Sequence, residues 1–299
     1  MIFLALLTAL LLHNVASLQG HKKPLDMMRS AVTQLSATGV MTLDNPATIE
    51  LKMQILQLGA SMDRGQLYNP TSGLQYKDNM DIARSKVKDL CRQSSKAFTM
   101  ENIDGEWELV LSTVPHGIFR SSPFFMAIQQ AYAEVGQPEK AGLFFKLHEL
   151  QTMSWGVSKI GRVGQTVSKS AGTLNSEFDT NIFALTVIPV FGWWKLLPTF
   201  GGCVVTESKV DLREDGEMTL EVDLTRAKPV KGLNTLPGGI GVDTKVPVGA
   251  LWKLLPWNKG RAATAKLFLR YVDDDLRVME DIDGEYFVYS RPVSQSSVI

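Results

Sequence analysis

Few side chains in this sequence have the type and spacing that acid–base chemistry requires. His13 and His21 lie in the N-terminal region, so His116 and His148 are the histidines left as candidates for proton transfer in the body of the chain. His148 and Glu149 could form an acid–base pair, but we expect them on a strand, where neighbouring residues face opposite ways. We therefore expect no catalytic residues.

Metal and nucleotide sites have no support either. No Cys lies near a His and no His-Glu-x-x-His motif occurs, so no metal is expected. The run Asp273–Asp275 could chelate a cation, yet it offers too few ligands alone, and Asp favours turns, so we expect a turn. Gly238–Gly241 lacks the strand–helix context of a nucleotide-binding motif and predicts a loop. No cofactor is expected.

The two cysteines and the overall charge exclude further classes of protein. Cys91 and Cys203 cannot build a disulfide framework; we expect two buried free thiols, although a single bridge is compatible with the sequence. In the 299 residues, 31 basic side chains balance 31 acidic ones, so nothing favours a nucleic-acid partner. The composition, with 44% hydrophobic and 21% charged residues, is typical of a globular protein.

The N-terminus reads as a two-part leader. Ile2–Leu12 is an apolar run that is too short for a transmembrane helix of about 20 residues but suits a signal peptide. Small residues at Val15–Ser17 provide a cleavage site, so we assign residues 1–17 to a signal peptide. Residues 18–43 carry three basic side chains against one acid, a composition that resembles a transit peptide, and we assign residues 18–45 to a transit-like segment. This combination predicts a plastid (chloroplast) protein, with secretion as the alternative.

The elements that must position any site begin with helices. From Pro46 to about Ser95 the apolar residues recur at helical spacing, and we expect the first helix to end near Gly59 and the breaker run Asp63-Arg64-Gly65. In the second helix, Ala83, Val87, Leu90 and Cys91 share one face. We assign residues 46–97 to an N-terminal helical segment.

Beyond Ala97 the hydrophobic period changes to two. Two alternating runs within residues 204–224 flank Asp215-Gly216, a strong hairpin signal. Further runs flank Asp273–Asp275 and Asp283-Gly284. Successive antiparallel strands with one apolar face predict a barrel or a sandwich, and a barrel of about eight strands can enclose one small ligand. We assign residues 98–292 to this body and 293–299 to a C-terminal tail.

The pentapeptide Trp-Lys-Leu-Leu-Pro occurs twice, at Trp194–Pro198 and Trp252–Pro256, in settings that otherwise share little, so a repeat is not expected. The first copy ends an apolar run that Pro189 and Gly192 interrupt, which favours strand, turn and strand over a membrane helix. The tryptophans could fill the core. Alternatively, an amphipathic rim could rest on a lipid surface, as Trp and Lys prefer; its members would be Trp193, Trp194, Lys195, Trp252, Lys253 and Trp257, with Lys259.

Three motifs together resemble the plastid lipid-associated protein, or fibrillin, family. Residues 102–112, Asn-Ile-Asp-Gly-Glu-Trp-Glu-Leu-Val-Leu-Ser, are similar to the opening of that family's barrel. Residues 119–125, Phe-Arg-Ser-Ser-Pro-Phe-Phe, look like its RSSPFF element, and residues 270–278, Arg-Tyr-Val-Asp-Asp-Asp-Leu-Arg-Val, resemble its YLDEDLRI signature. The resemblance covers most of residues 47–292. One departure is Glu280–Asp283, where the family commonly has Arg-Gly-Asp, and it removes a basic contact for an anionic headgroup.

The resemblance implies a mainly β fold, a lipocalin-like antiparallel β-barrel preceded by a short α-helical segment. It also implies binding of apolar lipids (carotenoid, quinone or fatty acyl), association with thylakoid or plastoglobule surfaces, and no enzymatic activity. The matched motifs supply the candidate lipid-binding residues Trp107, Arg120, Phe124, Phe125, Tyr271, Asp275 and Arg277. Arg277 could instead pair with Asp275 or Asp273 across the strand end.

Two other functions remain open at the level of sequence. One is a barrel enzyme that acts on an isoprenoid or fatty-acyl substrate and uses His116, His148 or a carboxylate. The other is a secreted interaction protein without a ligand. The position of the two histidines relative to the barrel interior separates the first alternative from a binding protein, and the leader separates the second.

Overall fold

The computed structural model describes residues 45–66, 73–93, 95–114, 117–153, 158–182, 187–188, 194–195, 200–230, 233, 245–254 and 260–293. The predicted signal peptide and transit segment lie outside these ranges, apart from Asn45. So do His116, Trp193, Trp257 and Lys259, the loop 238–241 and all of the predicted tail except Val293.

Two long helices open the described chain, as predicted. Helix α2 (Pro46–Ser61) begins with Pro46 at its first position, and the Asn45 side chain accepts a hydrogen bond from Ala47 N at 3.1 Å. A 3₁₀ turn, η1 (Asp63–Gly65), follows it. Helix α3 (Gly73–Cys91) buries Ala83, Val87 and Leu90 on the expected face. Helix α2 ends at Ser61, between Gly59 and the Asp63–Gly65 turn, as predicted.

Eight antiparallel strands form a closed barrel, which confirms the predicted fold class. The order is β6-β3-β2-β1-β11-β10-β9-β7, and β7 pairs with β6 to close the ring. A short strand, β8 (Lys245–Val246), pairs with the last part of β7. The barrel strands are β1 (Gly105–Ser112), β2 (Ser158–Ser168), β3 (Thr173–Ile182), β6 (Phe200–Leu212), β7 (Glu217–Lys228), β9 (Thr264–Val272), β10 (Leu276–Glu280) and β11 (Tyr286–Ser290).

Both predicted hairpins are present. Strands β6 and β7 pair from Cys203↔Lys228 to Leu212↔Met218 around the Asp215-Gly216 turn, where Gly216 has φ +88°. Strands β9, β10 and β11 follow one another as a meander joined at Asp273–Asp275 and Asp283-Gly284. Alternation with one apolar face therefore located these strands correctly.

Helices inside the barrel segment were not predicted. Between β1 and β2 the chain forms α5 (Gly117–Arg120), α6 (Pro123–Glu134) and α7 (Pro138–Met153). Two more short helices are α4 (Met100–Ile103), which precedes β1, and α8 (Val248–Lys253). His148 and Glu149 thus lie in a helix, and the expectation of a strand there was wrong. Helix α6 is buried continuously over residues 125–130, so it carries no helical period for a pattern search to find.

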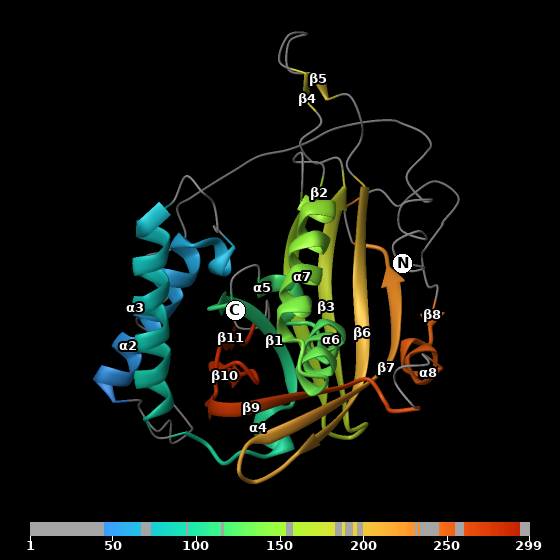
Figure 1. The fold of residues 1–299 in the computed structure, drawn as a ribbon. Helices are drawn as coiled ribbons and strands as arrows, with labels where there is room; N and C mark the ends of the chain where they lie inside the picture. The colour runs from blue at the N-terminus through green and yellow to red at the C-terminus, as the bar shows by residue number, and fades with distance from the viewer. Residues whose placement is uncertain are drawn as a thin grey trace.

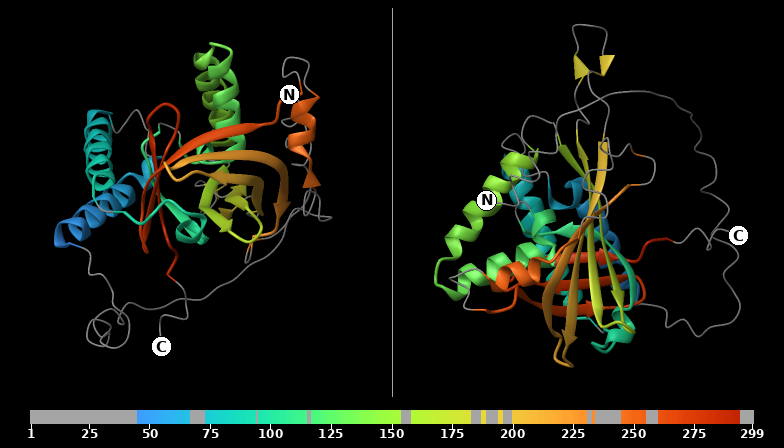
Figure 2. Two further views of the ribbon diagram at one scale, coloured as in Figure 1. Left: turned by 90° about the horizontal axis from the view of Figure 1, so that it is seen from below. Right: turned by 90° about the vertical axis from the view of Figure 1, so that its right-hand side faces the viewer.

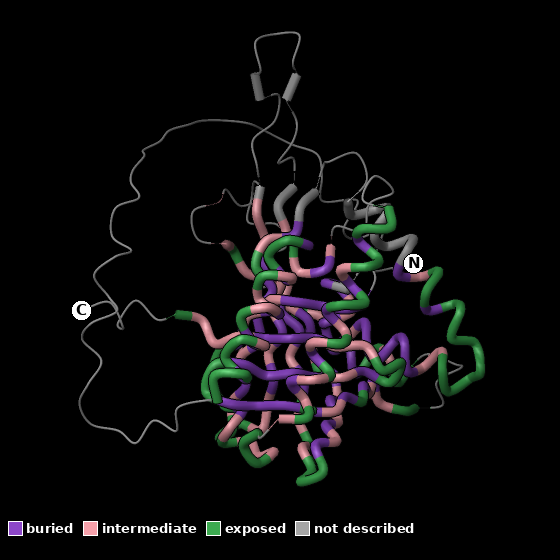
Figure 3. Tube along the Cα trace, turned by 90° about the vertical axis from the view of Figure 1, so that its left-hand side faces the viewer, coloured by how far each residue is buried: buried purple, intermediate pink, exposed green. Residues whose placement is uncertain are grey.

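The chain packs into two apolar layers, one inside the barrel and one outside it. Helices α2 and α3 cover the outer face of the β1–β11–β10–β9 wall (Figures 1 and 2), where Ile55 and Val87 pack with Val278 and Val288. The inner cluster combines inward residues of the strands with α5, α6 and α7. In Figure 3 the buried stretches, drawn in purple, accordingly run through the strands and the helices that face them.

The two Trp-Lys-Leu-Leu-Pro copies adopt different structures. Trp194 and Lys195 form β5, which pairs with β4 (Val187–Ile188), so strand, turn and strand is confirmed for the first copy. In the second copy, Trp252 and Lys253 end helix α8. The Trp-Lys pair that opens the pentapeptide is thus a strand in one place and a helix in the other, and it marks no structural repeat. Across the described ranges, no helix is both long and apolar enough to span a membrane.

Candidate functional site

Six polar side chains form an inward-facing row around the barrel, which we call the polar belt. Pairing places Arg277 of β10 opposite Tyr289 of β11. On the other side of β1, the row runs through Gln165 of β2, Ser176 of β3, Thr206 of β6 and Thr225 of β7, each in register with the next. All six are buried. A side-chain period of two turns these residues to the same face of the sheet.

Arg277 is the charged member of the belt. Its neighbours Leu276 and Val278 belong to the outer cluster, so alternation turns the Arg277 side chain into the barrel. It is completely buried, and Nη2 donates a hydrogen bond of 2.5 Å to Gln165 Oε1. The guanidinium carbon lies 4.8 Å from the ring centre of Trp107 and 4.7 Å from that of Tyr289. Two aromatic faces and one amide therefore hold this cation.

The other two nitrogens of Arg277, Nε and Nη1, have no hydrogen-bond partner among the described residues. Within these ranges no carboxylate pairs with the guanidinium. Burial lowers the pKa of Arg277 to about 10, and electrostatic repulsion by a second cation, Arg291, contributes to the decrease, so the side chain is still protonated near neutral pH. As far as the structure describes the chain, the barrel interior consequently carries a positive charge without a counter-ion.

Trp107 forms the floor beneath this cation. The indole Nε1 donates to the carbonyl oxygen of Ile103 in α4 at 2.8 Å, which ties the tryptophan to the helix at one end of the barrel. The Arg291 guanidinium lies 4.1 Å from the Trp107 ring centre, and its Nη1 and Nη2 donate to the carbonyls of Asp104 and Asn102. The Arg291 guanidinium thus hydrogen-bonds to backbone carbonyls, whereas that of Arg277 hydrogen-bonds to the side chain of Gln165.

Small hydroxyl side chains line the opposite side of the belt. The Thr206 hydroxyl lies 3.5 Å from the Thr225 hydroxyl and 3.5 Å from that of Ser122, which precedes α6. Ser208, the next inward residue along β6, is fully buried, and its Oγ has no hydrogen-bond partner among the described residues. Small polar groups that are not fully used are rare in barrel cores, because each one costs free energy unless something pairs with it.

Apolar layers flank the belt on both sides. Towards α4, Val167 and Leu174 follow Gln165 and Ser176 on the same strands and belong to the inner cluster. In the other direction lie Val163 and Phe178. Here Phe119 of α5 packs on both Phe178 and Phe125 of α6, with ring centres 5.9 Å apart in each pair. The belt is therefore a polar layer at the inner end of an apolar, aromatic region.

Two of the sequence-based candidates, Trp107 and Arg277, meet in the belt, and Phe125 lies in the apolar layer beyond it. Phe124 is half-buried, and its ring lies 6.4 Å from that of Trp252. Trp252 also forms a wall of an open groove of about 340 Å³ between α6, α8 and the start of β9. Packing against the core thus accounts for most of the Trp252 surface.

Tyr271 and Asp275 lie outside the barrel interior. Tyr271 belongs to the outer cluster, and its hydroxyl donates to Asp273 Oδ2 at 2.6 Å. Lys52 of α2 pairs with Asp273 at 2.5 Å and with the exposed Asp275 at 3.5 Å. The alternative of an ion pair between Arg277 and either aspartate was therefore wrong, because Lys52 takes that position and Arg277 points inward.

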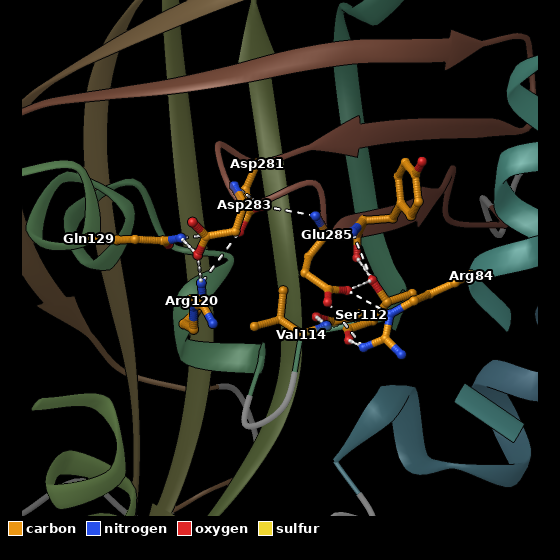
Figure 4. A network of polar contacts seen from close by, with 10 residues as sticks. Arg84, Ser112, Val114, Arg120, Gln129, Asp281, Asp283 and Glu285 are labelled. Carbon is orange, nitrogen blue, oxygen red and sulfur yellow. Dashed lines mark hydrogen bonds and ion pairs between the residues drawn. The ribbon is translucent and has the colours of Figure 1, made fainter. Parts of the chain in front are cut away.

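Arg120 also lies away from the belt. Figure 4 shows Arg120 and Gln129 directed at the β10–β11 turn, where Arg120 Nη2 lies 3.5 Å from Asp281 Oδ2 and 3.2 Å from Asp283 Oδ2. Gln129 Nε2 donates to Asp283 Oδ2 at 2.5 Å. Burial raises the pKa of Asp281, whose Oδ1 accepts from two backbone N–H groups of the turn. The acids that depart from the family pattern thus join α5 and α6 to this turn.

The same turn is joined to α3 on its other side (Figure 4). Arg84 donates from Nε and Nη2 to the two carboxylate oxygens of Glu285, at 3.0 and 3.1 Å, and to the carbonyl of Thr113 at 2.9 Å. Burial alone would lower the pKa of Arg84, but Glu285 and Asp81 raise it above the ordinary value. These contacts organise the wall of the barrel and do not reach its interior.

The candidates for membrane contact that the structure describes lie in two separate elements, β5 and α8. Lys253 is exposed, and its Nζ lies 3.6 Å from Glu221. Trp194 and Lys195 are placed only as backbone, in β5. On α8 the exposed apolar side chains are those of Leu251 and Leu254, which the sequence did not single out.

Neither cysteine has the character of a reactive group. Cys203 is buried, Cys91 is partly buried, and both are free thiols. Burial raises the pKa of each thiol to about 12, so neither is ionised near neutral pH. In the described part of the chain, no three His, Cys, Asp or Glu side chains gather in a way that could hold a metal ion.

No family model matches the sequence, and no curated protein or solved structure matches it. What the chain can do must therefore be argued from the barrel itself. The inward side chains offer a guanidinium, amide and hydroxyl groups at the belt and apolar groups beyond the belt. Sequence reasoning missed Gln165, Tyr289, Ser176, Thr206 and Thr225, because a polar residue at an inward strand position resembles an outward one until the register is known.

Proposed function

We propose that this protein binds an apolar lipid within its barrel and works at plastid membrane surfaces, thylakoid or plastoglobule, without catalysing a reaction. The observation that carries the proposal is a closed eight-stranded barrel with a polar layer at the inner end of an apolar, aromatic layer. A barrel of this size can hold one small ligand. An apolar wall stabilises a bound chain by about 25 cal/mol for each Å² buried, and a few polar groups fix its orientation.

The places of the three family-like motifs support the proposal. Residues 102–112 form β1 and put Trp107 inside. Residues 270–278 include the β9–β10 turn and put Arg277 in the belt. Residues 119–125 supply Phe119 and Phe125, which pack over the apolar side of the interior. Segments that are far apart in the sequence thus surround one interior.

The side chains of the belt favour binding over catalysis. Proton transfer near neutral pH needs a group whose pKa lies close to that pH. Burial moves the pKa of Tyr289 further up from its ordinary value, and Arg277 keeps its proton. Amide and hydroxyl groups complete the belt. These groups position a ligand and do not exchange protons with it.

Mass spectrometry of co-purified lipid tests the proposal. The full-length protein carrying an affinity tag is isolated from plastid membranes, extracted with organic solvent and compared with a mock purification. We expect one lipid class at about one molecule per barrel. A barrel that carries no lipid, and that also takes up none from vesicles, would contradict the binding function. Recovery of the protein only from the culture medium would contradict the plastid location.

A further inference from the structure

The least expected feature of the described residues is a fully buried guanidinium, that of Arg277, with no counter-ion among them. Arg277 uses one nitrogen on Gln165 and leaves Nε and Nη1 without hydrogen bonds among the described residues. Buried charges in proteins are normally paired, and a removed or missing partner is strongly unfavourable. Contact with Trp107 and Tyr289 offsets only part of that cost, because a cation–π contact is weaker than an ion pair.

The surroundings of Arg277 show that this charge is not needed to hold the barrel together. The ion pairs that tie elements to one another lie on the outer side of the wall, such as Lys52–Asp273 and Arg84–Glu285. Arg291 already joins Trp107 to the residues beside α4. An apolar side chain at position 277 would satisfy the packing between Trp107 and Tyr289. The positive charge therefore has a use other than stability.

We propose that the lipid is a long-chain carboxylic acid, whose carboxylate pairs with the free N–H groups of Arg277 while its chain lies against the apolar layer of Phe119, Val163 and Phe178. This inference rests on the proposed binding function and names its ligand class. A single buried guanidinium matches a monoanion. A phosphomonoester would bring a second negative charge that this site does not neutralise, and a carotenoid or a quinone would bring none.

The geometry also sets the orientation of the ligand. The belt lies between the apolar layer next to α4, around Val167 and Leu174, and the aromatic layer at Phe119 and Phe178. Because Trp107 and α4 occupy the first side, the acyl chain extends along the second side, with the headgroup inward. The Thr206–Thr225 pair lies in this polar layer, and its hydroxyl groups can donate to a carboxylate oxygen.

The test compares an acid with its ester. The full-length protein, stripped of lipid, is titrated at pH 7.5 with cis-parinaric acid and with methyl cis-parinarate, two probes that share one fluorescent chain. The carboxylate is ionised at this pH, and Arg277 remains a cation. We expect the acid to bind about 10- to 100-fold more tightly than the ester, the range of a charge-assisted hydrogen bond.

Variants assign the preference to one side chain. Arg277→Gln should weaken binding of the acid by about 10- to 100-fold and leave binding of the ester within about twofold. Arg277→Lys should retain part of the preference for the acid over the ester, because it keeps the positive charge but loses the two parallel N–H donors of the guanidinium. Arg92→Gln, at an exposed guanidinium on the residue after α3, is the matched control and should change neither affinity. Without ligand, Arg277→Gln should melt no lower than the wild type, since it removes an unpaired buried charge.

Two results would overturn the inference in different ways. Equal binding of acid and ester by the wild type, or an acid preference that survives in Arg277→Gln, would reject the carboxylate site and leave lipid binding intact. Failure of both probes to bind would reject the binding function itself. The wild-type comparison needs no variant, so the inference stays testable even where a substitution at residue 277 prevents folding.

Discussion

At the scale of single residues, Asp273 shows how one carboxylate can organise a turn. Its Oδ1 accepts from the backbone N–H groups of Asp275 and Leu276, at 2.8 and 2.7 Å. Its Oδ2 accepts from the Tyr271 hydroxyl and pairs with Lys52. The turn expected from the three aspartates is therefore confirmed, and only the first of them is used in this way.

The contacts of Asp273 lead to a prediction about pH. Burial alone would raise the pKa of this carboxyl, but Lys52, Tyr271 and the two backbone N–H groups lower it below the ordinary value of 3.8. The folded protein thus holds the proton less tightly than the unfolded chain. The stabilisation is complete above the unfolded pKa and is lost as the pH falls through the lower folded pKa.

We expect Asp273→Asn to reduce the free energy of unfolding at pH 7 by about 3 kcal/mol, because the buried Lys52 loses its nearer carboxylate and the turn loses the acceptor of two backbone N–H groups. Urea denaturation at pH 7 and again near pH 3 measures the loss, which should shrink at the lower pH. Asp275→Asn is the control. Its side chain is 76% exposed, so its loss should stay below about 0.5 kcal/mol. A loss that is the same at both pH values would contradict the assignment.

At the scale of elements, the success of sequence reasoning depended on how each element is buried. Helix α3 and the β6–β7 hairpin have one buried face, and their periodicity located them. Helix α6 is buried on nearly all sides from Phe125 to Gln130, so no periodic pattern exists. Gly59 marked the neighbourhood of a helix end in the sequence, and in the structure it also has a packing role, because it lies within α2 where the helix approaches the backbone of β1.

Gly59 carries the prediction at this scale. A Cβ at this position would lie 2.3 Å from the carbonyl oxygen of Val110 in β1, closer than atoms can approach. We expect Gly59→Ala to reduce the free energy of unfolding by about 2 kcal/mol, because α2 must move off the barrel wall.

Gly142 of α7 provides the opposite case in the same experiment. It lies in a helix, and a methyl group added there would meet nothing within 4 Å, so Gly142→Ala should stabilise the protein by about 0.5–1 kcal/mol through helix propensity alone. Chemical denaturation of Gly59→Ala and Gly142→Ala, beside the wild type, measures the change in the free energy of unfolding for each. Equal effects of the two substitutions would show that α2 and β1 are not in close contact.

At the scale of the whole molecule, the belt illustrates what sequence patterns leave undetermined. Its six members come from six strands, and each looks like an ordinary polar residue within its own segment. Only the register between strands brings them to one level of the barrel. Arg277 and Trp107 were chosen through a family resemblance, and the unpaired state of Arg277 could not be read from any motif.

The proposed membrane association would depend on which apolar side chains the surface of the molecule exposes. The exposed apolar side chains of α8 and the residue after it are Leu251, 49% exposed, and Leu254, 77% exposed, beside the exposed Lys253. Trp252 of the same helix packs inward against Phe124. We therefore propose that the leucines, rather than Trp252, make the lipid contact of this helix.

The double variant Leu251→Ser/Leu254→Ser should bind vesicles of galactolipid and phosphatidylglycerol about tenfold more weakly, because two apolar side chains no longer enter the interface. Sedimentation of protein with vesicles measures the effect, and the melting temperature should stay unchanged. Leu74→Ser, at a 78% exposed leucine on α3, serves as the control. A similar loss in the control, or none in the double variant, would exclude α8 as the contact.

Closure of the ring also determines when the fold can appear during biosynthesis. Strands β1 and β11 pair with each other, with Glu108 opposite Ser290. The backbone groups on this edge of β1, the first strand, therefore have no strand partner until β11, the last strand, has been synthesised. Helices α2 and α3 wait as well, since the wall they cover includes β9, β10 and β11. Such long-range pairing is slow compared with local structure. A nascent chain therefore carries an unfinished barrel until β11 has left the ribosome.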